Sequence, residues 1–135
     1  MAITHIDIGR EFPVPASAAW RLLADTRLWT SWGPTISDVD LDPPVIRTGA
    51  RGRVRTSVGA WLPFEITEVV PGTRWSWKVM GVPATGHRVE VTPTGSRVVF
   101  EVPTVVAPYA VVCRLALRRM ARLLTSGSGP APPAR

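Results

Sequence analysis

Residues 12–36, with the sequence FPVPASAAWRLLADTRLWTSWGPTI, constrain the fold of this chain more than any other segment. Pro15 or Ser17 begins a helix there, because good helix formers follow and proline is well tolerated in the first turn of a helix. Asp25 caps a second short helical turn, and Gly33 with the proline after it stops helical structure. The segment therefore predicts two short helices directly after a first strand.

The chain up to residue 102 otherwise alternates between apolar and polar side chains, which is the pattern of half-buried strands. The clearest turn between these runs is Pro71-Gly72, since proline presets one backbone dihedral and glycine is free to take a positive φ. The runs cover residues 3–12, 36–41, 52–58, 61–70, 74–80, 86–92 and 97–102. Six to seven strands joined mostly by tight turns predict an antiparallel sheet.

A long helix is expected at residues 108–124, with Pro108 in its first turn. Its apolar stripe comprises Tyr109, Cys113, Ala116, Leu117, Met120 and Leu124, and its opposite face carries Arg114, Arg118 and Arg122. These elements predict a single domain over residues 1–124. Residues 125–135, TSGSGPAPPAR, are rich in Gly, Ser and Pro and predict a disordered tail.

The composition narrows the class of protein. One cysteine excludes an internal disulfide, and one cysteine with two distant histidines does not make a zinc site, so we expect no metal. No glycine-rich phosphate loop or nucleophile elbow is present, so we expect no cofactor. No apolar run is long enough to cross a bilayer, and the alternating N-terminus is unlike a signal peptide. We therefore expect a cytoplasmic protein without integral membrane association.

The formal net charge of +6 is concentrated in the second half of the chain. Four arginines of the C-terminal helix, Arg114, Arg118, Arg119 and Arg122, contribute most visibly to it. One interpretation is a solvated, arginine-rich helix face; the other is a surface for an anionic partner or membrane. No nucleic-acid-binding motif accompanies the charge, so we expect no binding to nucleic acid.

The order of these elements resembles the helix-grip fold of the START and birch-pollen-allergen (SRPBCC) superfamily. Within that superfamily the chain is most similar to the polyketide cyclase/dehydrase and lipid-transport-like group. The resemblance rests on PASAAWRLL at 15–23, the W-x-x-W-x-P pattern at 29–34, FEITEVVPG at 64–72, and the strand at 86–92 with its turn. It covers residues 3–124 and implies an α+β fold, in which a curved antiparallel sheet wraps around the long C-terminal helix. It also implies a deep cavity between the sheet and this helix.

Side chains expected to line that cavity come from the inner face of the sheet, the C-terminal helix and the tryptophan-rich turn. If the face that carries Trp75 and Trp77 is concave, these residues line an apolar pocket; the alternative is plain core packing. The orientation of Trp61 is left open, because other residues of its strand compete for the inner face. The predicted ligand-binding residues are Trp32, Trp75, Trp77, Val79, Val89, Tyr109, Cys113 and Met120.

His87 shares its face of a predicted strand with apolar side chains, whereas His5 falls on the polar phase of the first strand. His87 is therefore the candidate catalytic residue for proton transfer; the alternative is a core histidine with its hydrogen bonds satisfied. The leading prediction is binding of a hydrophobic small molecule, a polyketide, lipid or aromatic compound. As an enzyme, the protein would direct cyclisation or dehydration by shape and one proton-transfer group, without metal or nucleotide. The alternative prediction is a non-catalytic interaction or membrane-surface module that uses the arginine face. The sequence does not indicate an oligomeric state.

Overall fold

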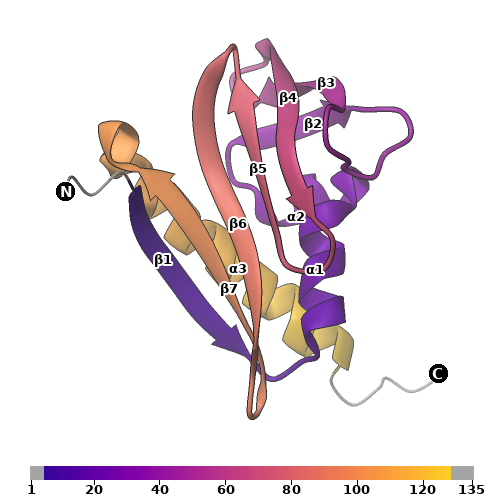
Figure 1. The fold of residues 1–135 in the computed structure, drawn as a ribbon, viewed down its shortest axis with the longest axis vertical. Helices are drawn as coiled ribbons and strands as arrows, with labels where there is room; N and C mark the ends of the chain where they lie inside the picture. Colours follow the sequence, from indigo (N-terminus) through magenta and orange to yellow (C-terminus); the bar gives the residue numbers. More distant parts are fainter. Residues whose placement is uncertain (1–4, 129–135) are drawn as a thin grey trace.

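A seven-stranded antiparallel sheet, one face of which is crossed by a long helix, forms the framework of the molecule (Figure 1). The computed structural model describes residues 5–128. In chain order the elements are β1 His5–Phe12, α1 Ala16–Ala24, the 3-10 turn η1 Thr26–Leu28, α2 Trp29–Trp32, β2 Ile36–Asp40, β3 Arg51–Thr56, β4 Trp61–Val70, β5 Arg74–Val79, β6 Val82–Thr92, β7 Gly95–Pro103, the 3-10 turn η2 Thr104–Tyr109 and α3 Ala110–Ser128. The predicted α+β helix-grip fold is confirmed.

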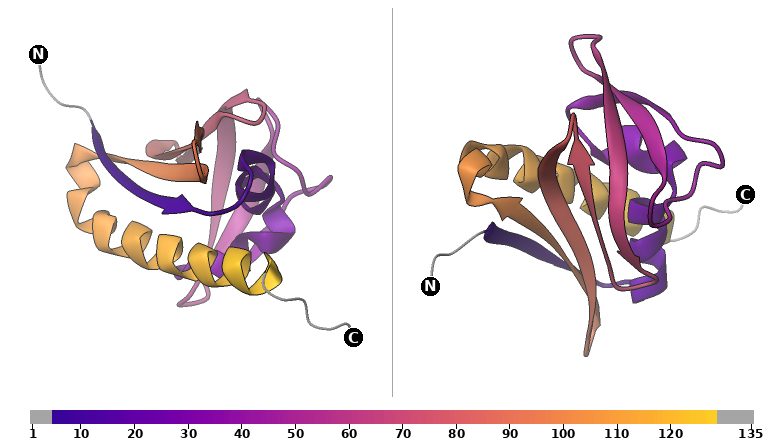
Figure 2. Two further views of the ribbon diagram at one scale, coloured as in Figure 1. Left: turned by 90° about the horizontal axis from the view of Figure 1, so that it is seen from below. Right: turned by 45° about the horizontal axis from the view of Figure 1, so that its top comes forward.

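The chain crosses from one edge of the sheet to the other between β1 and β2. At one edge β1 pairs with β7, from His5↔Pro103 to Phe12↔Ser96. The opposite edge is β2, so α1, η1 and α2 form the connection between the edges. From β2 onward each strand pairs with the next one in sequence, which makes a meander. The sheet curves around α3, which packs against β1 and β7 (Figure 2).

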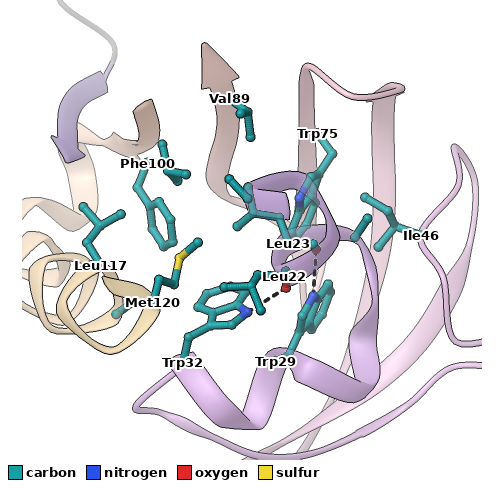
Figure 3. Close-up of a cluster of buried hydrophobic side chains, with 14 of the residues drawn as sticks. Leu22, Leu23, Trp29, Trp32, Ile46, Trp75, Val89, Phe100, Leu117 and Met120 are labelled. Atoms are coloured by element: carbon teal, nitrogen blue, oxygen red, sulfur yellow. Dashed lines mark hydrogen bonds between the residues drawn. The ribbon is translucent and has the colours of Figure 1, made fainter. Parts of the chain in front are cut away.

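The two tryptophans of α2 explain why the segment after α1 turns so tightly. The indole N–H of Trp29 donates to the carbonyl of Leu23 at 2.8 Å, and that of Trp32 donates to the carbonyl of Leu22 at 2.7 Å (Figure 3). Both carbonyls belong to the last turn of α1, where backbone carbonyl groups have no hydrogen-bond partner within the helix. The tryptophan-rich turn therefore satisfies the end of α1 while it buries two large rings.

The hairpin between β5 and β6 is tighter than the sequence predicted. Met80 and Gly81 both have positive φ, +53° and +76°, which is the geometry of a two-residue hairpin turn. As a result β6 begins at Val82, earlier than the expected start at Gly86. Methionine is not a typical turn residue, and proline is uncommon inside strands; in the sheet Pro83 lies beside an irregularity of register.

The C-terminal helix is also longer than predicted and begins later. Pro108 lies in η2 rather than in the first turn of α3, which starts at Ala110. The helix continues beyond the expected end at Leu124 to Ser128. Residues 129–135 of the predicted tail lie outside the described residues. The predicted apolar stripe faces the sheet, with Cys113, Ala116, Leu117, Met120 and Leu124 buried and Tyr109 partly exposed at its start.

The convex face of the sheet carries charged and aromatic side chains. Trp61 lies on this face, where the guanidinium of Arg53 is 4.7 Å from the centroid of its ring, so Trp61 points away from the concave side. Glu101 on β7 accepts hydrogen bonds from Arg74 on β5 and Arg88 on β6. Desolvation raises the pKa of Glu101, but these two guanidinium groups outweigh it and hold the pKa below its usual value.

Candidate ligand-binding site

Two spaces open on the concave side of the sheet. A small, partly open void of about 30 Å³ lies between the sheet, α2 and the first turns of α3. A larger groove of about 360 Å³ lies between strands β2 to β6 and η2. The groove is mostly apolar and is lined by Ile36, Val54, Leu62, Val79, Val82 and Val106, among others. Five residues line both spaces and form the boundary between them: Thr35, Ile36, Trp77, Thr85 and Tyr109.

Stacked aromatic rings fill much of the concave face. Trp75 stacks on two other rings. Its ring centroid is 5.2 Å from that of Trp29, with an angle of 4° between the ring planes, and 3.9 Å from that of His87, with an angle of 19°. The register of the sheet produces this arrangement, because Trp75 and His87 are directly opposed on β5 and β6. Phe100 meets His87 edge-on at 4.9 Å. The deep cavity expected next to the C-terminal helix is therefore largely filled, and the larger space is the groove beside η2.

His87 is held on the inner face by a short chain of hydrogen bonds. The indole N–H of Trp77 donates to Thr85 Oγ1 at 3.2 Å, and this oxygen lies 3.0 Å from Nε2 of His87. Burial lowers the pKa of His87 to about 3, because desolvation disfavours the charged imidazolium. The ring is therefore neutral at neutral pH and presents hydrogen-bonding nitrogens rather than a charge. A role of His87 in proton transfer stays a prediction.

A hydrogen bond between two boundary residues, Thr35 and Tyr109, links the loop after α2 to η2. Thr35 Oγ1, in the loop after α2, lies 2.9 Å from the hydroxyl of Tyr109 at the end of η2. Tyr109 is 38% exposed, so this contact lies at the surface of the site. The contact brings together two segments that are 74 residues apart in the chain.

The structure brings most of the predicted site residues together. Trp32, Trp75, Trp77, His87, Tyr109 and Cys113 all line the void. Val79 lines the groove, together with Trp77 and Tyr109. Val89 and Met120 are 6% and 0% exposed and belong to the core beside these spaces, so their contact with a ligand stays a prediction. Burial raises the pKa of the Cys113 thiol to about 12, which leaves it protonated and unreactive.

Two threonines were missed by the sequence interpretation. Thr85 has the same alternation phase as His87, but the expected start of the strand at Gly86 left it out. Beginning the predicted strand one residue earlier would have included Thr85. Thr35 sits in a loop after Gly33 and the next proline, and no local pattern connects it to Tyr109.

Metal and membrane features can be assessed over the described part of the chain. Among residues 5–128 no group of three or more His, Cys, Asp or Glu side chains is arranged to hold a metal ion. In the same range no helix combines the length and the apolar character that crossing a bilayer requires.

Comparisons with known proteins agree on one family and one fold. A family model described as polyketide cyclase / dehydrase and lipid transport matches residues 4–126. A protein from Nitrosomonas europaea has 20% sequence identity and a TM-score of 0.71, over 94% of this chain and 97% of its own. A protein from Mesorhizobium loti has 16% sequence identity and a TM-score of 0.76, over 94% of this chain and 99% of its own.

DynU16, a protein in the dynemicin biosynthetic locus, also has a similar structure. It is 20% identical, with a TM-score of 0.71 over 93% of this chain and 49% of DynU16. Identities this low establish the shared fold alone. A search of curated proteins gave no match.

Proposed function

We propose that this chain, which belongs to the polyketide cyclase/dehydrase and lipid-transport family, binds a hydrophobic small molecule in the groove beside η2. The groove carries the proposal, because its volume of about 360 Å³ is in the usual range for small-molecule sites and its walls are mostly apolar. Polyketides, lipids and aromatic compounds are the ligand classes that fit such walls.

The helix α3 covers only part of the concave face, which explains why apolar side chains remain exposed in the groove. α3 packs against β1 and β7, so the inner face of the strands nearer β2 has no long helix over it. Leu62, Trp77 and Val79 are consequently only partly buried, although they point to the concave side. A ligand that covers such surface gains roughly 25 cal/mol for each Å² of apolar area removed from water.

A cyclisation or dehydration step is the finer part of this proposal. The groove would hold an apolar chain in one folded shape, and His87, which lines the neighbouring void, would serve as the proton-transfer group. A polar ligand atom bound to His87 would replace part of its lost hydration and raise its pKa towards neutrality. The position of DynU16 in a biosynthetic locus supports a role with a small molecule.

The exposed face of α3 favours a second candidate function, binding to an anionic membrane surface. Arg114, Arg118 and Arg122 are exposed, and within the described residues none of them has an ion-pair partner. Val111 and Leu115 are exposed on the same side of the helix, at 69% and 38%. A basic face with apolar side chains is typical of helices that lie on anionic lipid.

One set of variants separates these functions. Val79→Trp fills the groove, and Val91→Trp is the matched control, because Val91 is 82% exposed and lies outside the groove. We expect the neutral probe N-phenyl-1-naphthylamine to bind at least tenfold more weakly to Val79→Trp and unchanged to the control. Wild-type affinity in a folded Val79→Trp protein would refute the groove. Arg118→Glu with Arg122→Glu should leave probe binding intact and abolish any sedimentation with phosphatidylserine vesicles.

A further inference from the structure

The wall of the groove beside η2 is uncharged. Among the described residues that line it, none is an Asp, Glu, Lys, Arg or His. The convex face of the same sheet differs in this respect, because a hollow of similar volume there, about 380 Å³, is lined by Arg74, Lys78 and Glu101, among others. The sheet therefore separates charged side chains on its convex face from an uncharged groove on its concave face.

The polar side chains of the groove wall are mostly hydroxyl groups that already have partners within the protein. Thr85 Oγ1 accepts from the indole N–H of Trp77 at 3.2 Å, and Thr56 Oγ1 accepts from a backbone N–H of the turn that follows it, also at 3.2 Å. The hydroxyls of Thr35 and Tyr109 lie 2.9 Å from each other. A charged group that leaves water needs several hydrogen bonds or a counter-charge in exchange. This wall offers no counter-charge and few free hydrogen-bonding groups.

Two titratable side chains on the concave side are neutral at pH 7. Tyr109 lines the groove, and burial raises its pKa, so its phenol keeps its proton. His87 lines the neighbouring void, and burial lowers its pKa to about 3, so its imidazole carries no charge. Neither side chain therefore supplies a counter-charge to a ligand at neutral pH.

We propose that the groove selects an uncharged ligand, a compact molecule with no carboxylate, phosphate or ammonium group on the part that enters it. The inference rests on the proposed function and narrows its ligands to neutral polyketides, neutral aromatic compounds and lipids without an ionised head group. The volume of about 360 Å³ lies near the lower end of the usual range for ligand pockets, which favours a molecule of a few rings over a two-chain phospholipid.

The test uses one ring system in three charge states. At pH 7, 1-naphthalenemethanol is neutral, 1-naphthylmethylamine is a cation and 1-naphthoate is an anion. Affinities come from ¹H–¹³C spectra of the full chain, in which the methyl signals of Leu62 and Val79 report on the groove. We expect the alcohol to bind at least about tenfold more tightly than either ion, because the wall does not compensate the lost hydration of a charge. The net charge of +6 attracts anions to the protein, so general electrostatics alone would favour the naphthoate.

A charge placed in the wall should change this selectivity. Val82 lines the groove and is 56% exposed, so Val82→Glu adds a carboxylate without disturbing the core. We expect Val82→Glu to bind 1-naphthylmethylamine about threefold or more tighter than the wild type does, and to bind the alcohol no more tightly. Val91→Glu is the matched control, since Val91 is 82% exposed and lies outside the groove, and it should leave all three affinities unchanged.

The outcomes separate the two proposals. If either ion binds as tightly as the alcohol and shifts the same methyl signals, the selection of uncharged ligands is overturned and the apolar groove stands. An unchanged preference in folded Val82→Glu would also overturn it. If the small probes are too weak to rank, N-phenyl-1-naphthylamine and its sulfonated analogue 1-anilinonaphthalene-8-sulfonate decide, with equal binding in the groove counting against the inference. If no neutral probe binds, the proposed function itself fails.

Discussion

Lowering the pH from 7 to 5 should destabilise the protein through His87. The folded state holds this imidazole neutral, because burial lowers its pKa to about 3, whereas in the unfolded chain the pKa is near 6.5. The unfolded state therefore binds a proton that the folded state does not bind, and stability falls as the pH drops below 6.5. A backbone hydrogen bond with Trp75 and the charge of Glu101 raise the pKa of His87 and the charge of Arg74 lowers it, but desolvation outweighs them and sets the direction.

The size of the effect follows from the two pKa values. Each unit of difference corresponds to 1.36 kcal/mol, so the free energy of unfolding should fall by about 2 kcal/mol between pH 7 and pH 5. The full difference, roughly 4–5 kcal/mol, would be reached only near pH 3. Most carboxyl groups titrate below pH 5, so the range from 7 to 5 isolates the histidine.

Urea unfolding followed by far-UV circular dichroism at both pH values measures this loss. His87→Leu should keep a nearly constant free energy of unfolding over the range, whatever its stability at pH 7. His5→Asn is the control, because His5 is the other histidine of the chain and is exposed. A wild-type change below about 0.5 kcal/mol would refute the reasoning, as would an unchanged pH slope in His87→Leu.

Two further predictions concern the convex face and the buried thiol. Glu101→Gln should cost about 2 kcal/mol in urea unfolding at pH 7, because a nearly buried carboxylate loses charged bonds to two arginines. Asp40→Asn should cost less than about 0.5 kcal/mol, since Asp40 and its arginine partner are more than half exposed; equal costs would contradict the difference in burial. Cys113 should react with Ellman's reagent only as fast as the chain unfolds and at once in urea. Rapid labelling of the native protein would show that α3 does not bury it.

The fold was predictable because its signals are local. Alternation and turn residues locate a strand whether or not its partner is known, and the tryptophan-rich turn showed its helices by proline, glycine and capping residues. The turn at Met80 and Gly81 was missed because a methionine with positive φ is rare and has no sequence signature. The end of α3 was misplaced because Thr, Ser and Gly at its C-terminus are poor helix formers.

The site was predictable only in part, because its shape depends on contacts between distant segments. Alternation placed Trp75, Trp77 and His87 on one face, and the structure brings them together. No local pattern indicates that Trp29 stacks on Trp75 and fills the concave side. The family resemblance implied a deep cavity under the helix, whereas the larger of the two spaces on the concave side lies at the part of the sheet that the helix does not cover.

The pairing of the first strand with the last also has a consequence for synthesis on the ribosome. β1 is made first, but its one partner in the sheet is β7, whose residues 95–103 follow only after the whole meander. At a translation rate of about 5–20 residues per second, β1 waits several seconds or more before it can pair. Ile8 and Phe12, which are buried in the finished sheet, are uncovered throughout that time. The nascent chain therefore has an interval in which chaperones, or other chains, can reach a strand that the folded protein hides.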